Sequence, residues 1–367
     1  MIQNSAIFTN LENLENSIFF NISKATLKFS EKIKNLKLAQ RLGNNLGQYI
    51  NLIHLMLDFS WNPLGEKETS FIFQGLGKCV NLKCLTLQMS SNKIGASTLQ
   101  ILALEMQNCR KINELTIDLN KNIINNKGAS IIGHLIGNME YLEKVMLDLR
   151  WCSIEASGGS ELGIGIGNSP SLKDLEISLG GNTICGQGAT DLCFGLSNSK
   201  SLKALTLKFT GKNQIGDDGV YGMCSGLVQF ENLQLLTLDL RDSNISAYGA
   251  SDLGYGLGNC QNLQFLTLNL ASDYFQNFQN KVGNAGVQGL ILGLSNSSKL
   301  KTLKLDLSQN QINRIDKVCI SGFFNLLMLT SMELCLNSNK MNLQDQKKFL
   351  AKTKTMRRLV KYNVKCS

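Results

Sequence analysis

Proline, paired cysteine motifs and long apolar runs are scarce or missing in this sequence. Only 2 of the 367 residues are proline, while 18% are charged and 43% hydrophobic. This composition lacks the bias of disordered, collagen-like or mucin-like chains. No run of 18 apolar residues occurs, and the start, MIQNSAIFTNLENLENS, has no basic segment ahead of an apolar stretch. We therefore expect neither a membrane span nor a signal peptide.

The cysteines indicate a reducing compartment. Their number, 11, is odd, and no CxxC spacing occurs among them. Without a secretory signal, this pattern favours free thiols in the cytosol or nucleus.

Positive charge is concentrated at one end of the chain. The formal net charge is +9, and the segment 342–367 holds eight basic residues and one Asp, a local net charge of +7. The other 341 residues therefore carry only +2. A basic tail on a nearly neutral body differs from a basic body built to bind nucleic acid.

A repeat of about 30 residues dominates the sequence. The pattern Leu-x-x-Leu-x-Leu-x-Leu recurs with its first apolar residue at Ile22, Leu52, Leu82, Ile112, Leu142, Leu172, Leu202, Leu233, Leu263, Leu300 and Leu329. Apolar residues then alternate, as in Leu175 and Ile177, which predicts a strand with one buried face. Later in each unit they recur at three- and four-residue spacing, as in Ala189, Leu192 and Leu196, which predicts a helix. One unit cannot bury its apolar face alone, so about eleven units must stack into a solenoid.

Asn recurs ten positions after the first apolar residue of most units. The members are Asn62, Asn92, Asn122, Asn182, Asn310 and Asn339, with Asn213 and Asn280 displaced by extra residues. Cys152 and Ser243 take the same position in two units. A fourth apolar residue, such as Leu119, precedes the Asn and extends each strand.

From about residue 22 to 341 these units resemble leucine-rich repeats of the ribonuclease-inhibitor-like class. The resemblance implies an α/β horseshoe with parallel strands on the concave face and helices on the convex face. It also implies that the Asn side chains form a ladder that satisfies backbone groups in the turns, a role that Cys or Ser fills less completely. The repeat specifies a fold far better than a function.

We expect three segments along the chain. Residues 1–21 form an N-terminal cap, in which Leu11, Leu14 and Ile18 have helical spacing. Residues 22–341 form the solenoid. Residues 342–367 form a basic C-terminal cap that can supply a last helix and a short strand around Leu359 to Val364.

No group of residues predicts catalysis or metal binding. The cysteines are scattered over positions that hold Ser, Ala or Gly in other units, and His54 and His134 lie in different repeats and columns. The string GIGIG at residues 163–167 is not followed by a phosphate-loop lysine. We therefore expect a protein that is not an enzyme and that holds no cofactor and no metal.

The outward strand positions of the concave face are the first candidate binding site. Equivalent positions in successive repeats form columns along this face. One column is rich in Thr, and the next contains Asp58, Asp118, Asp148, Asp239 and Asp306. Aspartate is disfavoured in strands, which suggests a binding role, although a solvated face is the alternative. Strands lie about 4.8 Å apart, so Asp118 and Asp148 would repel unless a cation or basic partner relieves them. Such a column repels phosphates and favours a basic peptide.

Aromatic residues on one rim are the second candidate. The insertion ASDYFQNFQ lengthens one repeat and brings Tyr274, Phe275 and Phe278 to one loop. Trp61 and Trp151 share the column just before the Asn position on the same rim. Exposed aromatic residues are favoured interface anchors, and packing onto the core is the alternative.

The basic tail is the third candidate. Its members are Lys347, Lys348, Lys352, Lys354, Arg357 and Arg358. Such a tail can contact RNA, an acidic protein or an anionic membrane surface, or it can form a solvated polar cap.

These observations favour a non-enzymatic scaffold or adaptor that binds a protein partner, a basic peptide or a large assembly, through its concave face and ascending rim. One alternative is a GTPase-activating regulator, because the Ran GTPase-activating proteins use this repeat class, although no residue here matches a catalytic one. Another is an RNA-binding solenoid that uses the tail and outer helices. A ligase substrate receptor is disfavoured because no F-box-like segment precedes the repeats. The abundance of Asn, Lys and Ile and the scarcity of Pro suggest a protist source, where many such repeat proteins belong to large assemblies including cilia. We therefore expect a cytoplasmic protein, in a cytoskeletal or ciliary assembly.

Overall fold

The computed structural model shows an elongated, open array of alternating strands and helices. It describes residues 5–16, 22–29, 33, 35–273, 278–356 and 358–366. The strands are β1 Ser5–Phe8, β2 Lys24–Lys28, β3 His54–Asp58, β4 Cys84–Gln88, β5 Glu114–Asp118, β6 Lys144–Asp148, β7 Asp174–Ser178, β8 Ala204–Lys208, β9 Leu235–Asp239, β10 Phe265–Asn269, β11 Thr302–Asp306, β12 Ser331–Cys335 and β13 Lys361–Lys365. The helices are α1 Leu11–Glu15, α2 Leu36–Leu46, α3 Glu66–Leu76, α4 Ala96–Met106, α5 Asn125–Gly137, α6 Ala156–Gly167, α7 Cys185–Leu196, α8 Gly216–Leu227, α9 Ala247–Gly258, α10 Gly283–Leu294, α11 Lys317–Asn325 and α12 Leu343–Thr353.

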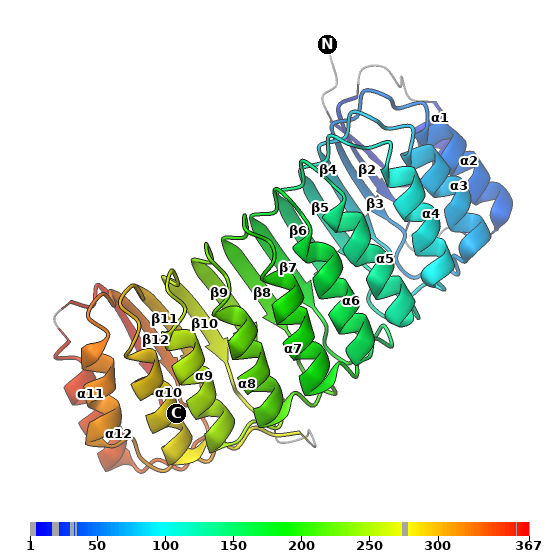
Figure 1. The fold of residues 1–367 in the computed structure, drawn as a ribbon. Helices are drawn as coiled ribbons and strands as arrows, with labels where there is room; N and C mark the ends of the chain where they lie inside the picture. Colours follow the sequence, from blue (N-terminus) through cyan, green and yellow to red (C-terminus); the bar gives the residue numbers. More distant parts are fainter. Residues whose placement is uncertain are drawn as a thin grey trace.

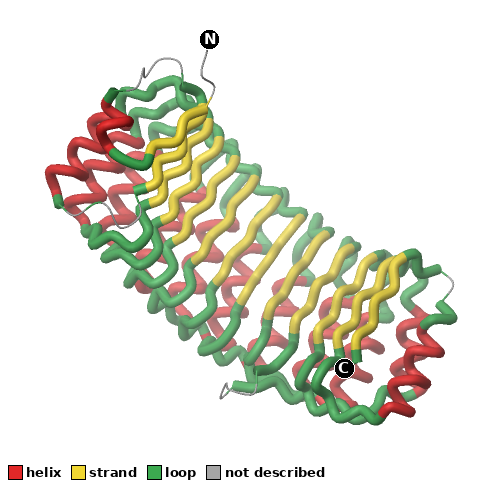
Figure 2. Tube along the Cα trace, turned by 180° about the vertical axis from the view of Figure 1, so that it is seen from behind, coloured by secondary structure: helices red, strands yellow, loops and turns green. Residues whose placement is uncertain are grey.

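The strands form one parallel sheet in sequence order from β1 to β13. The helices lie together on one side of this sheet (Figure 1), and the opposite view shows the strands uncovered (Figure 2). We call the strand-bearing surface the sheet face and the opposite surface the helix face. The predicted α/β leucine-rich repeat solenoid is confirmed.

Repeat leucines form one continuous core between the two layers. In β7, for example, Leu175 and Ile177 are fully buried, and they pack with Leu192 and Leu196 of α7 in the same cluster. This cluster runs from Phe8 at one end to Met356 at the other. Each unit therefore buries its apolar face against the neighbouring units, as in other solenoids.

The two ends of the array extend the sheet beyond the eleven predicted units. At the C-terminus, α12 and β13 agree with the predicted last helix and short strand. At the N-terminus, α1 agrees with the predicted helix over Leu11 and Leu14, while Ile18 lies outside the described residues. Strand β1 was not predicted, and it pairs in parallel with β2 through Ser5 and Lys24.

The Asn ladder is present and connects successive turns. Asn182 Oδ1 accepts the backbone N–H groups of Cys152 at 2.9 Å and Ile154 at 3.1 Å. Its Nδ2 donates to the carbonyl oxygens of Leu149 at 2.8 Å and Leu179 at 2.7 Å. Asn182 is buried, so it satisfies four backbone groups that water does not reach.

The ladder weakens at Cys152 and Ser243, as the resemblance to leucine-rich repeats implies. Cys152 Sγ donates weakly to the Leu119 carbonyl at 3.2 Å, and Ser243 Oγ donates to Arg241 O at 3.4 Å. Cys152 Sγ also accepts the backbone N–H of Asn122 in the preceding turn, but its contacts are fewer than the four that Asn182 makes. A short hydroxyl or thiol cannot satisfy as many backbone groups in both turns as an amide does.

Candidate protein-interaction surfaces

The recurring Asp residues of the sheet face end their strands. Asp58 Oδ1 accepts the backbone N–H of Ser60 at 3.0 Å, and Asp118 Oδ1 accepts that of Asn120 at 2.9 Å. At the end of β11, Asp306 Oδ1 likewise accepts the backbone N–H of Ser308 at 2.9 Å. A carboxylate that accepts the N–H at i+2 forms an Asx turn, so this column has a structural use that the sequence analysis missed.

Two Asp residues of this column are also paired with Arg. Arg150 Nε lies 2.8 Å from Asp148 Oδ1, and Arg241 Nε lies 2.9 Å from Asp239 Oδ1, each in a two-nitrogen contact. Both guanidinium groups are about half exposed, so each pair adds little to stability, about 1 kcal/mol or less. Their side chains line a shallow hollow of about 580 Å³ over β5 to β9.

Asp118 and Asp148 are register neighbours, as predicted, and the cation beside them is Arg150 of the same chain. Burial is the main factor that raises the pKa of Asp118, and the Asp148 carboxylate raises it further, while Arg150 lowers it. Among the described residues, Asp58, Asp118 and Asp306 form no ion pair. Arg150 nevertheless acts electrostatically on Asp118, and Arg241 on Asp306.

An exposed apolar pair on the sheet face escaped the sequence analysis. Leu235 and Phe265 are register partners at the start of β9 and β10, and they are 39% and 41% exposed. The small Ala204 of β8 lies beside Leu235. Aligning the first outward position of each strand would have revealed the pair, because most other strands place charged or polar residues there.

The rim column of Trp61 and Trp151 has a backbone that disfavours large side chains. Their φ angles are +58° and +56°, in the left-handed region that favours glycine. Gly181, in the same position one repeat after Trp151, has φ +73°. The N–H of Trp61 donates to Ser90 O at 2.9 Å, so the conformation extends the pairing between repeats.

Both indoles are half exposed and lie beside a lysine. Trp61 is 57% exposed, with Lys121 Nζ 5.5 Å from the ring centroid. Trp151 is 50% exposed, with Lys212 Nζ 5.1 Å from its ring. A Cβ at Gly181 would lie 2.4 Å from Trp151 Cδ2, so this indole rests on the glycine backbone. Each ring therefore leaves part of its surface available to another molecule.

The insertion and the tail are only partly described. Tyr274 and Phe275 lie outside the described residues, and Phe278 is half-buried, with its carbonyl accepting Asn244 N at 2.8 Å. In the tail, Arg357 also lies outside the described residues.

The described tail residues differ in their contacts. The exposed ones are Lys347, Lys348, Lys352 and Lys354. Arg358 is half-buried, and its Nη2 donates to the carbonyls of Phe323 at 2.9 Å and Phe324 at 2.7 Å. This side chain therefore satisfies carbonyls at the end of α11.

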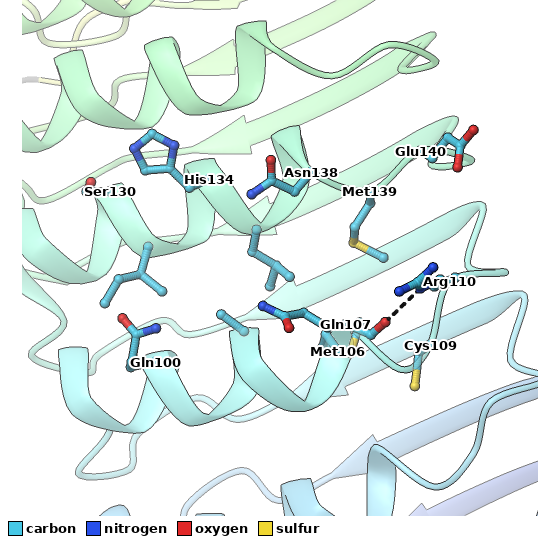
Figure 3. A pocket seen from close by; sticks show the side chains of 13 residues that line it. Gln100, Met106, Gln107, Cys109, Arg110, Ser130, His134, Asn138, Met139 and Glu140 are labelled. Atoms are coloured by element: carbon cyan, nitrogen blue, oxygen red, sulfur yellow. Dashed lines mark hydrogen bonds between the residues drawn. The ribbon is translucent and has the colours of Figure 1, made fainter.

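Figure 3 shows a hollow of about 580 Å³ on the helix face, between α4 and α5. Most neighbouring helices meet through glycine: a Cβ on Gly165 of α6 would lie 2.4 Å from the carbonyl carbon of Gly133 of α5. Between α4 and α5 the equivalent residues are Ala103 and Leu135, which line the hollow. Their side chains keep these two helices further apart. His134, on the wall of the hollow, lies 4.0 Å from Glu161 of α6.

The described residues contain no group of three or more His, Cys, Asp or Glu side chains placed to hold a metal ion. No helix among them is long and apolar enough to cross a membrane. All eleven cysteines are described and free. Burial raises the pKa of Cys109 to about 11, so this thiol is protonated at neutral pH.

Comparison with known proteins shows no family for this chain. No family model matches the chain, and no curated protein matches it. Among solved structures, a chain in the crystal structure of the Rad7 and Elc1 complex in yeast matches 82% of this chain and 76% of its own length. The two are 16% identical, with a TM-score of 0.38. The fold described above therefore defines an α/β repeat solenoid on its own evidence.

Proposed function

We propose that this protein is a non-enzymatic scaffold or adaptor that binds a protein partner through its sheet face and the rim of Trp61 and Trp151. The observation that carries the proposal is the pair of half-exposed indoles in left-handed backbone. A large residue in that conformation costs about 1 to 2 kcal/mol relative to glycine. Ser91, Lys121 and Gln309 have the same backbone conformation in this column, so the conformation belongs to the repeat, whereas the exposed indole does not. Trp is favoured as an interface anchor.

The sheet face beside this rim supports the same proposal. Leu235 and Phe265 add exposed apolar area, and the hollow over β5 to β9 adds charged groups of both signs. Asp58, Asp118 and Asp306 form no ion pair among the described residues, which fits a partner segment that carries Lys or Arg.

We assign the repeats to the ribonuclease-inhibitor-like class as part of this proposal. The Asn ladder and the helix in each unit support it. The proposal places the protein in the cytoplasm, where its eleven free thiols would stay reduced, within a cytoskeletal or ciliary assembly.

Affinity purification with matched variants tests the scaffold function. The test variant is Trp61→Gly with Trp151→Gly, which keeps the backbone conformation, because Gly181 occupies the same column. The control is Tyr141→Ala, which removes an aromatic side chain that is 57% exposed outside this rim. We expect a protein partner with the wild type and the control, and its loss with the double variant. Recovery of RNA alone from every version would contradict the proposal.

A further inference from the structure

The helix face over α6 to α9 carries an apolar patch that the sheet-face proposal does not use. Its members are Ile164, Phe194, Tyr221, Val228 and Tyr255, each between 37% and 64% exposed. Three of the five are aromatic, the residue type favoured at the centre of interfaces. Contiguous apolar patches on a surface mark interaction sites more often than single exposed residues do.

Close helix packing makes the patch continuous. Ile164, Phe194 and Tyr255 occupy equivalent positions on α6, α7 and α9, with Ser225 between them on α8. The backbone nitrogen of Phe194 would lie 2.9 Å from a Cβ on Gly226 of the next helix. Such contacts bring helix axes to about 9 Å, so the outer side chains form one row across the helices.

A hollow of about 810 Å³ lies in the middle of this row. Ile164, Phe194 and Val228 contribute apolar walls, and Asp191 lies at its edge. The edge also includes Lys200, whose Nζ is 2.8 Å from Glu231 Oε1, so that positive charge is already paired.

The charge of this face is opposite in sign to that of the whole chain. Helices α6 to α9 contain no Lys or Arg, and their carboxylates are Glu161, Asp191, Asp217, Asp218 and Asp252. Asp191 and Asp252 form no ion pair within the described ranges. They lie one turn before Phe194 and Tyr255, along one edge of the apolar row.

We infer that the helix face over α6 to α9 is a second docking surface, and that its occupant is a basic amphipathic helix of a partner protein. The apolar face of that helix would lie on the row centred on Phe194, and its Lys or Arg residues would face Asp191 and Asp252. The three spacings between the axes of helices α6 to α9 add up to about 27 Å, which is the length of about 18 helical residues. Nucleic acid is a poor occupant, because carboxylates without cations repel phosphates.

The test uses a synthetic helix of about 18 residues with a leucine face bordered by lysine, and a scrambled peptide of the same composition. We expect the full-length protein to bind the amphipathic peptide in fluorescence anisotropy and to bind the scrambled peptide at least about tenfold more weakly. Phe194→Asp should weaken binding by about tenfold or more, and so should Asp191→Lys combined with Asp252→Lys.

Leu104→Asp is the matched control, because Leu104 is 59% exposed at the equivalent position of α4, outside the patch. It should leave binding unchanged, and circular dichroism should show all variants folded. Equal binding of both peptides, or full binding by Phe194→Asp, would overturn the inference. Self-association that Phe194→Asp abolishes would also overturn it, because the occupant would then be a second copy of this chain.

Discussion

The ladder residue Asn182 permits the sharpest test of the fold. Asn182→Ala would remove four hydrogen bonds at 2.7 to 3.1 Å and leave the N–H groups of Cys152 and Ile154 and the carbonyl of Leu149 unsatisfied. The Leu179 carbonyl would still accept Asn213 Nδ2 at 2.9 Å. Each such buried group costs about 1 to 3 kcal/mol, and these losses overlap, so we expect a total destabilisation of about 3 to 4 kcal/mol. Urea unfolding followed by circular dichroism measures the change as a lower midpoint.

Hydrogen exchange locates the same effect. The amides of Cys152 and Ile154 should exchange faster in Asn182→Ala, because both donate to the lost Oδ1. Asn120→Ala is the control, since Asn120 Oδ1 has no hydrogen-bond partner, and its effect should stay within about 0.5 kcal/mol. A loss below about 1 kcal/mol for Asn182→Ala, with exchange unchanged, would refute the ladder as a source of stability.

Three further predictions concern charge, helix packing and the tail. Asp118→Asn should stabilise the protein at pH 7 by up to about 1 kcal/mol. The pKa of Asp118 is raised in the folded protein, so ionisation of this carboxyl lowers the stability as the pH rises above about 4. Thermal melts at pH 7 and pH 3 should show the gain only at pH 7. Gly195→Ala should destabilise by about 2 kcal/mol or more in urea, because its Cβ would lie 2.5 Å from the carbonyl carbon of Gly163 in the preceding helix α6. Gly95→Ala should not, because its nearest atom lies at 3.6 Å. Arg358→Ala should lose about 1.5 to 3 kcal/mol of unfolding free energy through its two carbonyl contacts, and the exposed Lys352→Ala should lose almost none.

The fold was predictable because it depends on a repeat period of about 30 residues that can be read directly from the sequence. Alternating leucines and the Asn column follow from burial and turn geometry, and both can be counted along the chain. Strand β1 was missed because Ser5 to Phe8 lack the leucine pattern and are held by pairing with β2. That pairing is a tertiary contact, which local sequence does not encode.

The candidate sites were less predictable because they depend on backbone angles and neighbours. The positive φ of Trp61 is set by pairing between repeats, and its column contains Ser and Lys as often as Gly. The Asx turn at Asp118 depends on a hydrogen bond to Asn120 that the strand end creates. The acidic helix face could have been found earlier, since the absence of Lys and Arg in α6 to α9 is visible once the helices are assigned.

The most direct test of the scaffold function follows the two indoles during binding. Trp61 and Trp151 are the only tryptophans of the chain, so 5-fluorotryptophan incorporation gives two fluorine signals that a partner's own tryptophans do not obscure. We predict that the partner recovered by affinity purification shifts both signals and shields both indoles from a soluble quencher. Binding of that partner with both signals and their quenching unchanged would contradict the account.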